Sequence, residues 1–172
     1  GTGNAQALMT TALEETEQMF GDMSLWQSML DRQRELFVEM DSGSRLGFVS
    51  REASGILPGK HREGVQVVTE VPMMAWEIEN GGMSARIERF AGLAATRVDV
   101  LLVVDREAME TMLAGLGGDM FKTIKQLIRR GNIMFFLFKN KTQLQDAGYE
   151  DFLESLGLAF IVAGDLLVGG AS

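Results

Sequence analysis

Four short apolar runs, separated by segments with helical spacing, constrain the fold of this chain more than any other feature of its sequence. They are VQVVTEV at 65–71, VDVLLVV at 98–104, IMFFLF at 133–138 and AFIVAG at 159–164. Continuously apolar strands are typical of parallel sheets that are covered on both faces. A further short strand is expected near residues 46–49. The sequence therefore predicts a three-layer α/β domain with a mostly parallel sheet of about four to five strands.

The segments between these runs predict helices with recognisable ends. One helix is expected over 107–113, a second after Asp119, and a third over 141–156. Asp119 has the side chain of a helix N-cap, and Gly131 and Gly157 are typical of residues that follow a helix C-terminus. These alternating strands and helices favour the α/β class.

Residues 72–96, PMMAWEIENGGMSARIERFAGLAAT, fit two structures. We expect two helices that are broken at Gly81 and Gly82. The alternative is a hairpin at 74–90 with its turn at ENGG, because AWEI and SARIERF also alternate between apolar and polar residues. That hairpin would make the chain an α+β domain with antiparallel strands.

The N-terminal region has the apolar spacing of an amphipathic helix from residue 5 to 40, with an interruption near Gly21 and Asp22. We therefore divide the chain into a helical arm, 1–41, and a single α/β domain, 42–172. The arm carries seven acidic and two basic residues between 14 and 39, a net charge of −5. It is a candidate dimerisation element, so a homo-oligomer is expected.

Composition excludes several classes of function. The chain has 172 residues, a formal net charge of −8, no cysteine and a single histidine, His61. A disulfide, a thiolate nucleophile and a cysteine-ligated metal are excluded, and no metal site is predicted. The acidic balance argues against nucleic-acid binding, and the longest apolar run is too short to span a membrane. We expect a soluble cytoplasmic protein; no motif identifies a cofactor, which stays unknown.

Polar residues that follow the apolar runs are the candidate site, since ligands bind beyond the carboxyl ends of strands in open α/β sheets. Asp105 and Glu70 are candidate catalytic acids, and Lys139 and Asn140 are candidate ligand-binding residues. Two acids and a lysine are able to hold a divalent cation and a phosphoryl group. The GLGGD sequence at 115–119 does not form a nucleotide-binding P-loop, because Asp119 and Met120 stand where Lys and Ser or Thr are required.

Two groups of basic residues are candidate anion sites. Lys60, His61 and Arg62 lie together in a turn-rich segment that is able to close over an anion. Lys122, Lys125 and Arg129 share one face of the helix expected after Asp119, and no acidic residue lies between Asp119 and Asp146. This stripe complements the helix dipole, docks the acidic arm of the same or a sister chain, or receives an acidic partner or phosphorylated ligand.

No catalytic motif is present, so the sequence favours a regulatory or ligand-binding and interaction module that binds an anionic small molecule or an acidic partner. The alternative is an enzyme that acts on a small phosphorylated metabolite. In that enzyme Asp105 or Glu70 would be the general base. Lys139, or the loop that contains Lys60, His61 and Arg62, would hold the phosphate.

Overall fold

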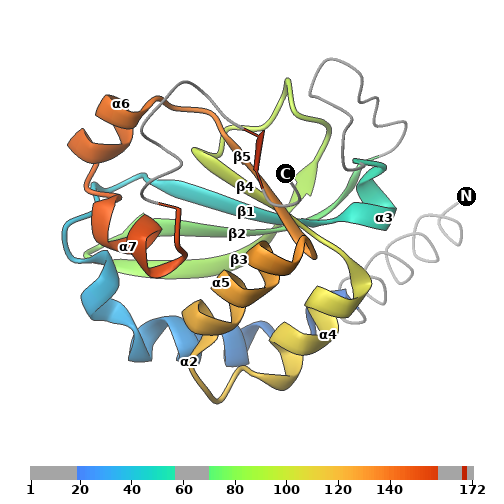
Figure 1. Ribbon diagram of the computed structural model, residues 1–172. Coiled ribbons are helices and arrows are strands. Elements are labelled where there is room, and N and C mark those ends of the chain that lie inside the picture. The colour runs from blue at the N-terminus through green and yellow to red at the C-terminus, as the bar shows by residue number, and fades with distance from the viewer. Residues whose placement is uncertain (1–18, 57–69, 159–167, 170–172) are drawn as a thin grey trace, which may run out of the picture.

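A computed structural model describes residues 19–56, 70–158 and 168–169, and its centre is a mixed β-sheet (Figure 1). The strands are β1 (Arg45–Ser50), β2 (Val71–Glu79), β3 (Gly82–Phe90), β4 (Val100–Val104), β5 (Ile133–Leu137) and the short β6 (Val168–Gly169). Their order across the sheet is β3-β2-β1-β4-β5-β6. Of the five neighbouring pairs in this order, β1 and β4 run parallel and the other four are antiparallel. The prediction of a mostly parallel sheet is therefore wrong.

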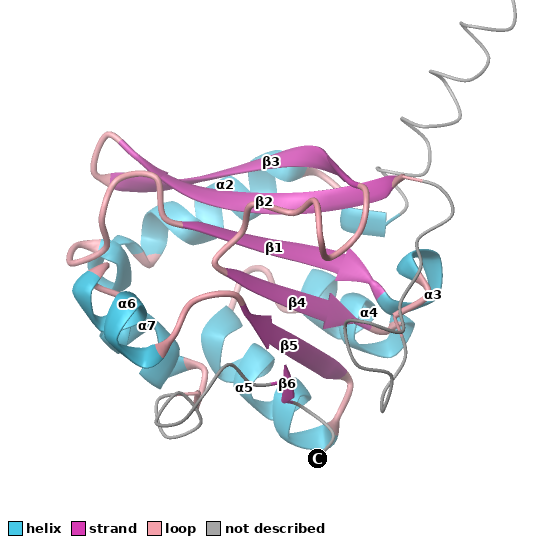
Figure 2. Cartoon of the chain, turned by 90° about the horizontal axis from the view of Figure 1, so that it is seen from above, coloured by secondary structure: helices cyan, strands magenta, loops and turns pink. Residues whose placement is uncertain are grey.

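The helices lie on one side of the sheet, as Figure 2 shows from above. They are α2 (Met23–Arg32), the 3-10 helix η1 (Arg34–Phe37), α4 (Arg106–Ala114), α5 (Met120–Arg130), α6 (Lys141–Asp146) and α7 (Glu150–Ser155). Their buried side chains join one face of the sheet in a single apolar cluster. Over the described residues the fold therefore has two layers, and the predicted three layers are not found. A further short helix, α3 (Arg51–Ser54), follows β1 directly.

Burial on both faces explains why the strands are continuously apolar. In β4, Val100, Leu102 and Val104 belong to the helix-side cluster, whereas Leu101 and Val103 belong to a second buried cluster on the opposite face. Every residue of β4 is buried as a result. The apolar run thus reports burial on both faces and carries no information about strand direction.

The connection between β4 and β5 explains why this pair is antiparallel. Parallel neighbours need a crossover, usually one helix, that returns the chain to the starting edge of the sheet. Here two consecutive helices, α4 and α5, join the strands, and the chain enters β5 from the edge at which β4 ends. Val104 is accordingly opposite Ile133, and Val100 is opposite Leu137.

Residues 71–90 form the hairpin that the sequence offered as an alternative, and the predicted helices over this segment are wrong. Glu79 is paired with Gly82, so the turn consists of Asn80 and Gly81. Both have positive φ, 51° and 80°, which a two-residue hairpin turn of this kind requires and which Asn-Gly favours. The fold therefore belongs to the α+β alternative.

The predicted ends of the helix after Asp119 are confirmed: Asp119 caps α5 with its side chain, and Gly131 ends α5 with a φ of 83°. Asp22 and Asp105 also cap helices, α2 and α4, with their side chains; the sequence predicted Asp105 as a catalytic acid instead. The single helix expected over 141–156 is instead two helices, α6 and α7, separated near Gly148.

The N-terminal helix α2 packs on the sheet: its side chains Trp26, Met29 and Leu30 are buried in the helix-side cluster. Residues 1–18 lie outside the described residues, as do the expected strand segments 65–69 and 159–164. The boundary at residue 41 therefore stays a prediction.

Candidate functional site

An open cleft of about 570 Å³ lies at the carboxyl ends of the parallel strands β1 and β4. The residues that line it come from the ends of β1 and β4, from α3 and α4, from the start of β2 and from the segment before α2. They are Met19, Ser50, Glu52, Ala53, Glu70, Val71, Pro72, Val104, Asp105, Arg106, Met109, Glu110 and Leu113. We call this the α3–α4 cleft. Its size lies within the usual range for small-molecule sites, about 300–1,000 Å³.

The inner part of the cleft is apolar because it is built from strand ends and from one face of α4. Val71 and Val104 are buried, and Met109 is 8% exposed. Arg106 and Glu110, and likewise Met109 and Leu113, are four residues apart, so the two pairs form adjoining rows on the same side of α4. That side faces the cleft, while Ala108 and Met112 are fully buried in the helix-side cluster.

Asp105 is positioned as the N-cap of α4. One of its carboxylate oxygens accepts a hydrogen bond from the Ala108 amide at 2.8 Å, and the other accepts one from the Asn132 side chain, also at 2.8 Å. The Arg51 guanidinium lies 3.8 Å from the second oxygen and donates to the Gly131 carbonyl oxygen at 2.8 Å. Both oxygens of Asp105 are thus occupied by contacts that hold α4 and the end of α5 in place.

Glu70 also lines the cleft, so the structure brings the two predicted acids to one site. Its side chain is 51% exposed and lies 3.3 Å from Arg89, which is more exposed still. Such an exposed ion pair contributes little to stability. Glu70 is therefore far less constrained than Asp105 and is available to a ligand.

Lys139 and Asn140 do not join these acids. Because β5 is antiparallel to β4, its carboxyl end lies beside the start of β4, at the opposite end of the sheet from Asp105. Lys139 contacts the Asp99 carboxylate at 3.1 Å. Asn140 caps α6 in a reciprocal pair of hydrogen bonds with Gln143, of 2.8 and 2.9 Å. The predicted grouping of two acids with a lysine is not assembled.

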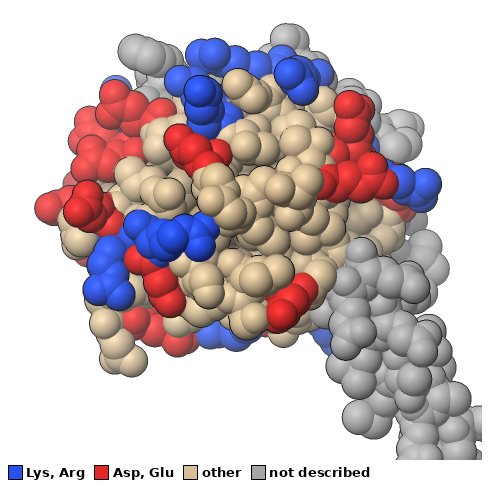
Figure 3. All heavy atoms as spheres, turned by 90° about the horizontal axis from the view of Figure 1, so that it is seen from below, with Lys and Arg blue, Asp and Glu red and all other residues tan. Residues whose placement is uncertain are grey.

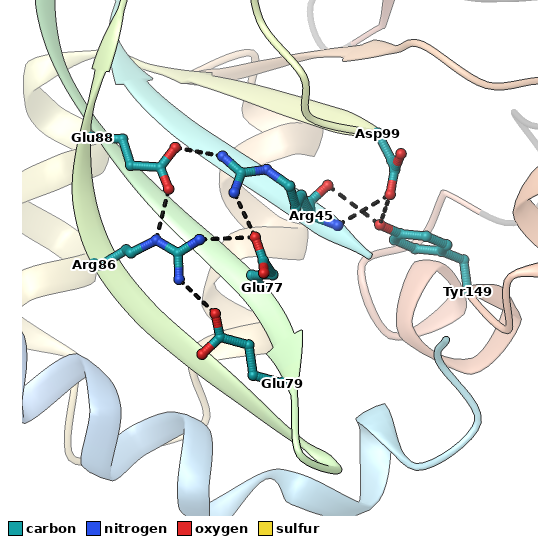
Figure 4. Close-up of polar contacts among 7 residues, drawn as sticks. All are labelled: Arg45, Glu77, Glu79, Arg86, Glu88, Asp99 and Tyr149. Atoms are coloured by element: carbon teal, nitrogen blue, oxygen red, sulfur yellow. Dashed lines mark hydrogen bonds and ion pairs between the residues drawn. The ribbon is translucent and has the colours of Figure 1, made fainter. Parts of the chain in front are cut away.

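The buried carboxylate that Lys139 contacts is the centre of a polar cluster (Figure 4). Asp99 accepts hydrogen bonds from the Tyr149 hydroxyl at 2.6 Å and from the Arg45 amide at 3.0 Å. Burial, together with this carboxylate, raises the pKa of Tyr149 well above its usual value, so the phenol stays protonated as a donor. The cluster ties the α6–α7 region to the starts of β1 and β4, and we assign it a structural role.

A second charged network joins β1 to the hairpin on the sheet face opposite the helices (Figure 4). Arg45 donates to Glu77 and Glu88, and Arg86 donates to the same two carboxylates at 2.8 and 2.7 Å. Glu79 accepts a further bond from Arg86 at 2.8 Å. Hydrogen bonds from Arg45 lower the pKa values of Glu77 and Glu88. The network is internally paired, and it leaves no carboxylate free to act on a ligand.

The predicted basic stripe lies on α5 as expected. Lys122 and Arg129 are exposed, and Lys125 is half-buried. No salt bridge to any of the three is formed within the described part of the chain. Figure 3 shows Lys and Arg side chains gathered along one edge of the helical face. Lys60, His61 and Arg62 lie outside the described residues, so their role as an anion-binding loop stays a prediction.

Sequence reasoning missed Met109, Glu110 and Leu113, the side of α4 that faces the cleft. A signal was present, because the apolar face of α4 is wide. Ala108, Met109 and Met112 belong to the helix-side cluster and Leu113 packs against it, and Met109 and Leu113 also line the cleft. No helix in the described ranges is long and apolar enough to span a bilayer. Within those same ranges no three acidic or imidazole side chains are grouped as a metal site would require.

Comparison with known proteins gives distant structural likenesses. No known family model matches the sequence, and no curated protein matches it significantly. One similar solved structure is a conserved hypothetical protein from Thermus thermophilus, described as possibly a sterol carrier protein; it is 15% identical, with 88% of this chain and 91% of that chain covered and a TM-score of 0.38. Another is the UbiJ-SCP2 ubiquinone synthesis protein, 13% identical, with 90% and 97% covered and a TM-score of 0.32. Neither likeness is close enough to assign a family or a ligand.

Proposed function

We propose that the protein is a ligand-binding module and that the α3–α4 cleft holds a small molecule with an apolar portion. The observation that carries this proposal is the cleft itself, which combines an apolar interior with polar groups around it. Small-molecule sites commonly have this composition: apolar walls supply affinity, and a few polar groups fix orientation. Its position at the carboxyl ends of two parallel strands also agrees with where α/β sheets bind ligands.

An anionic ligand in this cleft is disfavoured. Among the described residues, four carboxylates line the cleft, from Glu52, Glu70, Asp105 and Glu110, against one guanidinium, that of Arg106. Lys139, the expected phosphate-binding residue, is at the other end of the sheet. A phosphorylated metabolite would need cations from outside this set, so we do not extend the proposal to an enzyme that acts on one.

The cleft is tested with decanol as a neutral apolar probe and methionine methyl resonances as reporters. Binding is expected to shift the Met19 and Met109 ε-methyl resonances, which line the cleft, and to leave Met134 unchanged, because it is buried in the cluster on the opposite sheet face. Ala53→Trp fills the cleft from its exposed rim and should abolish the shifts. Ala114→Trp, at an exposed position of α4 outside the cleft, should not. Shifts that survive Ala53→Trp, or no shifts at all, would contradict the proposal.

A second function is favoured by the stripe on α5. Lys122 and Arg129 are exposed and without an ion-pair partner among the described residues, so we propose that α5 docks an acidic protein segment. The sequence of residues 14–17, which includes three glutamates and no cation, supplies such a segment from a second copy of the chain. This form of the proposal retains the expected homo-oligomer.

Sedimentation velocity at low and high salt tests this docking. Reversal of Lys122, Lys125 and Arg129 to Glu should reduce the mass at low salt to that of a single chain, because it replaces the attraction to the acidic segment with repulsion. High salt should reduce the wild-type mass as well, because salt screens attraction between exposed charges. The control reverses Arg34, Arg97 and Lys141, which are exposed cations elsewhere, and so changes the net charge equally. Equal effects of the two triple variants would show that only net charge matters.

A further inference from the structure

The charges around the α3–α4 cleft bear on the class of ligand, and the inference drawn from them rests on the proposed ligand-binding function. Among the described lining residues, the carboxylates of Glu52, Glu70, Asp105 and Glu110 outnumber one guanidinium, that of Arg106, which gives a formal charge of −3. The apolar surface of Val71 and Met109 lies within the same cleft. The combination requires a ligand that is both apolar and complementary to negative charge.

The N-terminus of α4 borders the cleft, but two of its first three amides are already occupied. A helix N-terminus normally favours anions, because its first amides lack partners within the helix. Here Glu52 accepts the Arg106 amide at 2.8 Å, and Asp105 accepts the Ala108 amide at 2.8 Å. An anionic head group would have to displace one of these carboxylates and would then lie beside both of them. Carboxylates of the chain itself thus occupy the helix N-terminus, which would normally attract an anion.

Two other carboxylates remain available to a cation. Glu110 is exposed and has no hydrogen-bond or ion-pair partner in the described part of the chain. Glu70 is 51% exposed, and its contact with Arg89 at 3.3 Å involves a side chain that is itself 72% exposed. A ligand ammonium that approaches these two groups would gain attraction without breaking a buried contact. By contrast, Asp105 is held by its cap and by Asn132.

We infer that the α3–α4 cleft takes a cationic amphiphile. Its apolar chain packs against Val71, Val104 and Met109, and its ammonium group lies beside Glu70 and Glu110. Because the attraction is between partly exposed charges, it adds specificity for the cation to an affinity that comes mainly from the apolar chain.

The inference is tested with three probes that share one chain length: decyltrimethylammonium, decanol and decanoate, each below its micelle concentration. Dissociation constants come from the shifts of the Met19 and Met109 methyl resonances. The ammonium is expected to bind about three- to tenfold more tightly than decanol at low salt, which corresponds to two exposed ion pairs. Decanoate should bind most weakly, and added salt should reduce the preference for the ammonium.

Charge-neutral variants locate the effect. The double variant Glu70→Gln with Glu110→Gln should bring the ammonium to the affinity of decanol. The matched control, Glu150→Gln with Glu154→Gln on α7, removes the same number of exposed charges outside the cleft. It should preserve the preference for the ammonium over decanol. A preference that survives the first double variant would overturn the assignment to these two groups.

The outcomes separate this inference from the function on which it rests. If decanol binds as tightly as the ammonium, or decanoate binds most tightly, the cationic class is wrong while the cleft remains a ligand site. If no probe shifts the cleft methyl resonances, the ligand-binding function fails and the inference fails with it.

Discussion

Gly148→Ala is expected to destabilise the protein strongly, because the backbone of another segment lies against this glycine. Gly148 has a φ of 83°, and a left-handed backbone costs an L-residue about 1–2 kcal/mol. A Cβ at this position would lie only 1.7 Å from the Glu39 carbonyl oxygen. The two segments must separate, which would break the hydrogen bond of 2.9 Å from the Asp41 amide to the Ala147 carbonyl oxygen. Such a bond contributes about 0.5–1.5 kcal/mol to stability. The expected loss is about 1.5–3.5 kcal/mol in total.

Gly55→Ala is the matched control for this contact. Gly55 also has a left-handed backbone, with a φ of 75°, but nothing lies within 4 Å of its added Cβ among the residues that the structure describes. It should therefore lose only the backbone component, about 1–2 kcal/mol. Urea denaturation followed by circular dichroism gives the free energy of unfolding of both variants. Equal losses would refute the argument that the Glu39 contact limits this position.

Three further results are expected from stability measurements. Tyr149→Phe should cost about 1.5–3 kcal/mol in urea denaturation, since it removes the hydrogen bond from the phenol to the buried Asp99 carboxylate; an unchanged free energy would show that Asp99 is satisfied without it. Arg45 lowers the pKa of Glu88 below its usual 4.5, so the stabilisation from Glu88 is present above that pH and is lost as pH falls through the lowered value. Glu88→Gln should remove this part of the pH dependence of the free energy of unfolding. Parallel pH profiles of the variant and the wild type would contradict this. Asp105→Ala should cost about 0.5–2 kcal/mol, while Asp105→Asn should cost less because Asn is also a good N-cap; equal costs of the two variants would mean that the charge of Asp105 matters more than its cap.

Helix ends could be predicted from the sequence because their causes are local. The side chain of Asp119 reaches the amide of Lys122 only three residues away, and Gly131 adopts the left-handed backbone that ends α5. Each signal is complete within one turn of helix, so no distant contact decides it. The expected segment and the observed segment therefore agree closely for α5.

Strand direction could not be predicted in the same way. An apolar run such as 133–138 is buried on both faces whether its neighbour is parallel or antiparallel. Direction depends on how α4 and α5 return the chain to the sheet, which is a property of packing over more than twenty residues. The hairpin at 71–90 was obscured for a related reason: Met73, Met74, Ala75 and Trp76 are all buried, so the expected alternation is lost. Asn80 and Gly81, which adopt positive φ in the turn, are the local sequence signal for the hairpin.

Strand direction also decides which of the predicted site residues reach the cleft. The one rule used to locate it, that ligands bind at the carboxyl ends of parallel strands, applies only to β1 and β4, and those two strands do end at the α3–α4 cleft. Asp105 was found because it follows β4, whereas Lys139 was misplaced because β5 runs the other way. The cleft also depends on the start of β2 and on the side of α4 that carries Met109, Glu110 and Leu113. Only the folded sheet brings these two parts of the chain together. A carboxylate at a strand end does not by itself indicate chemistry: Asp105 is occupied as a helix cap, and the proposed ligand contacts fall to the less constrained Glu70 and Glu110.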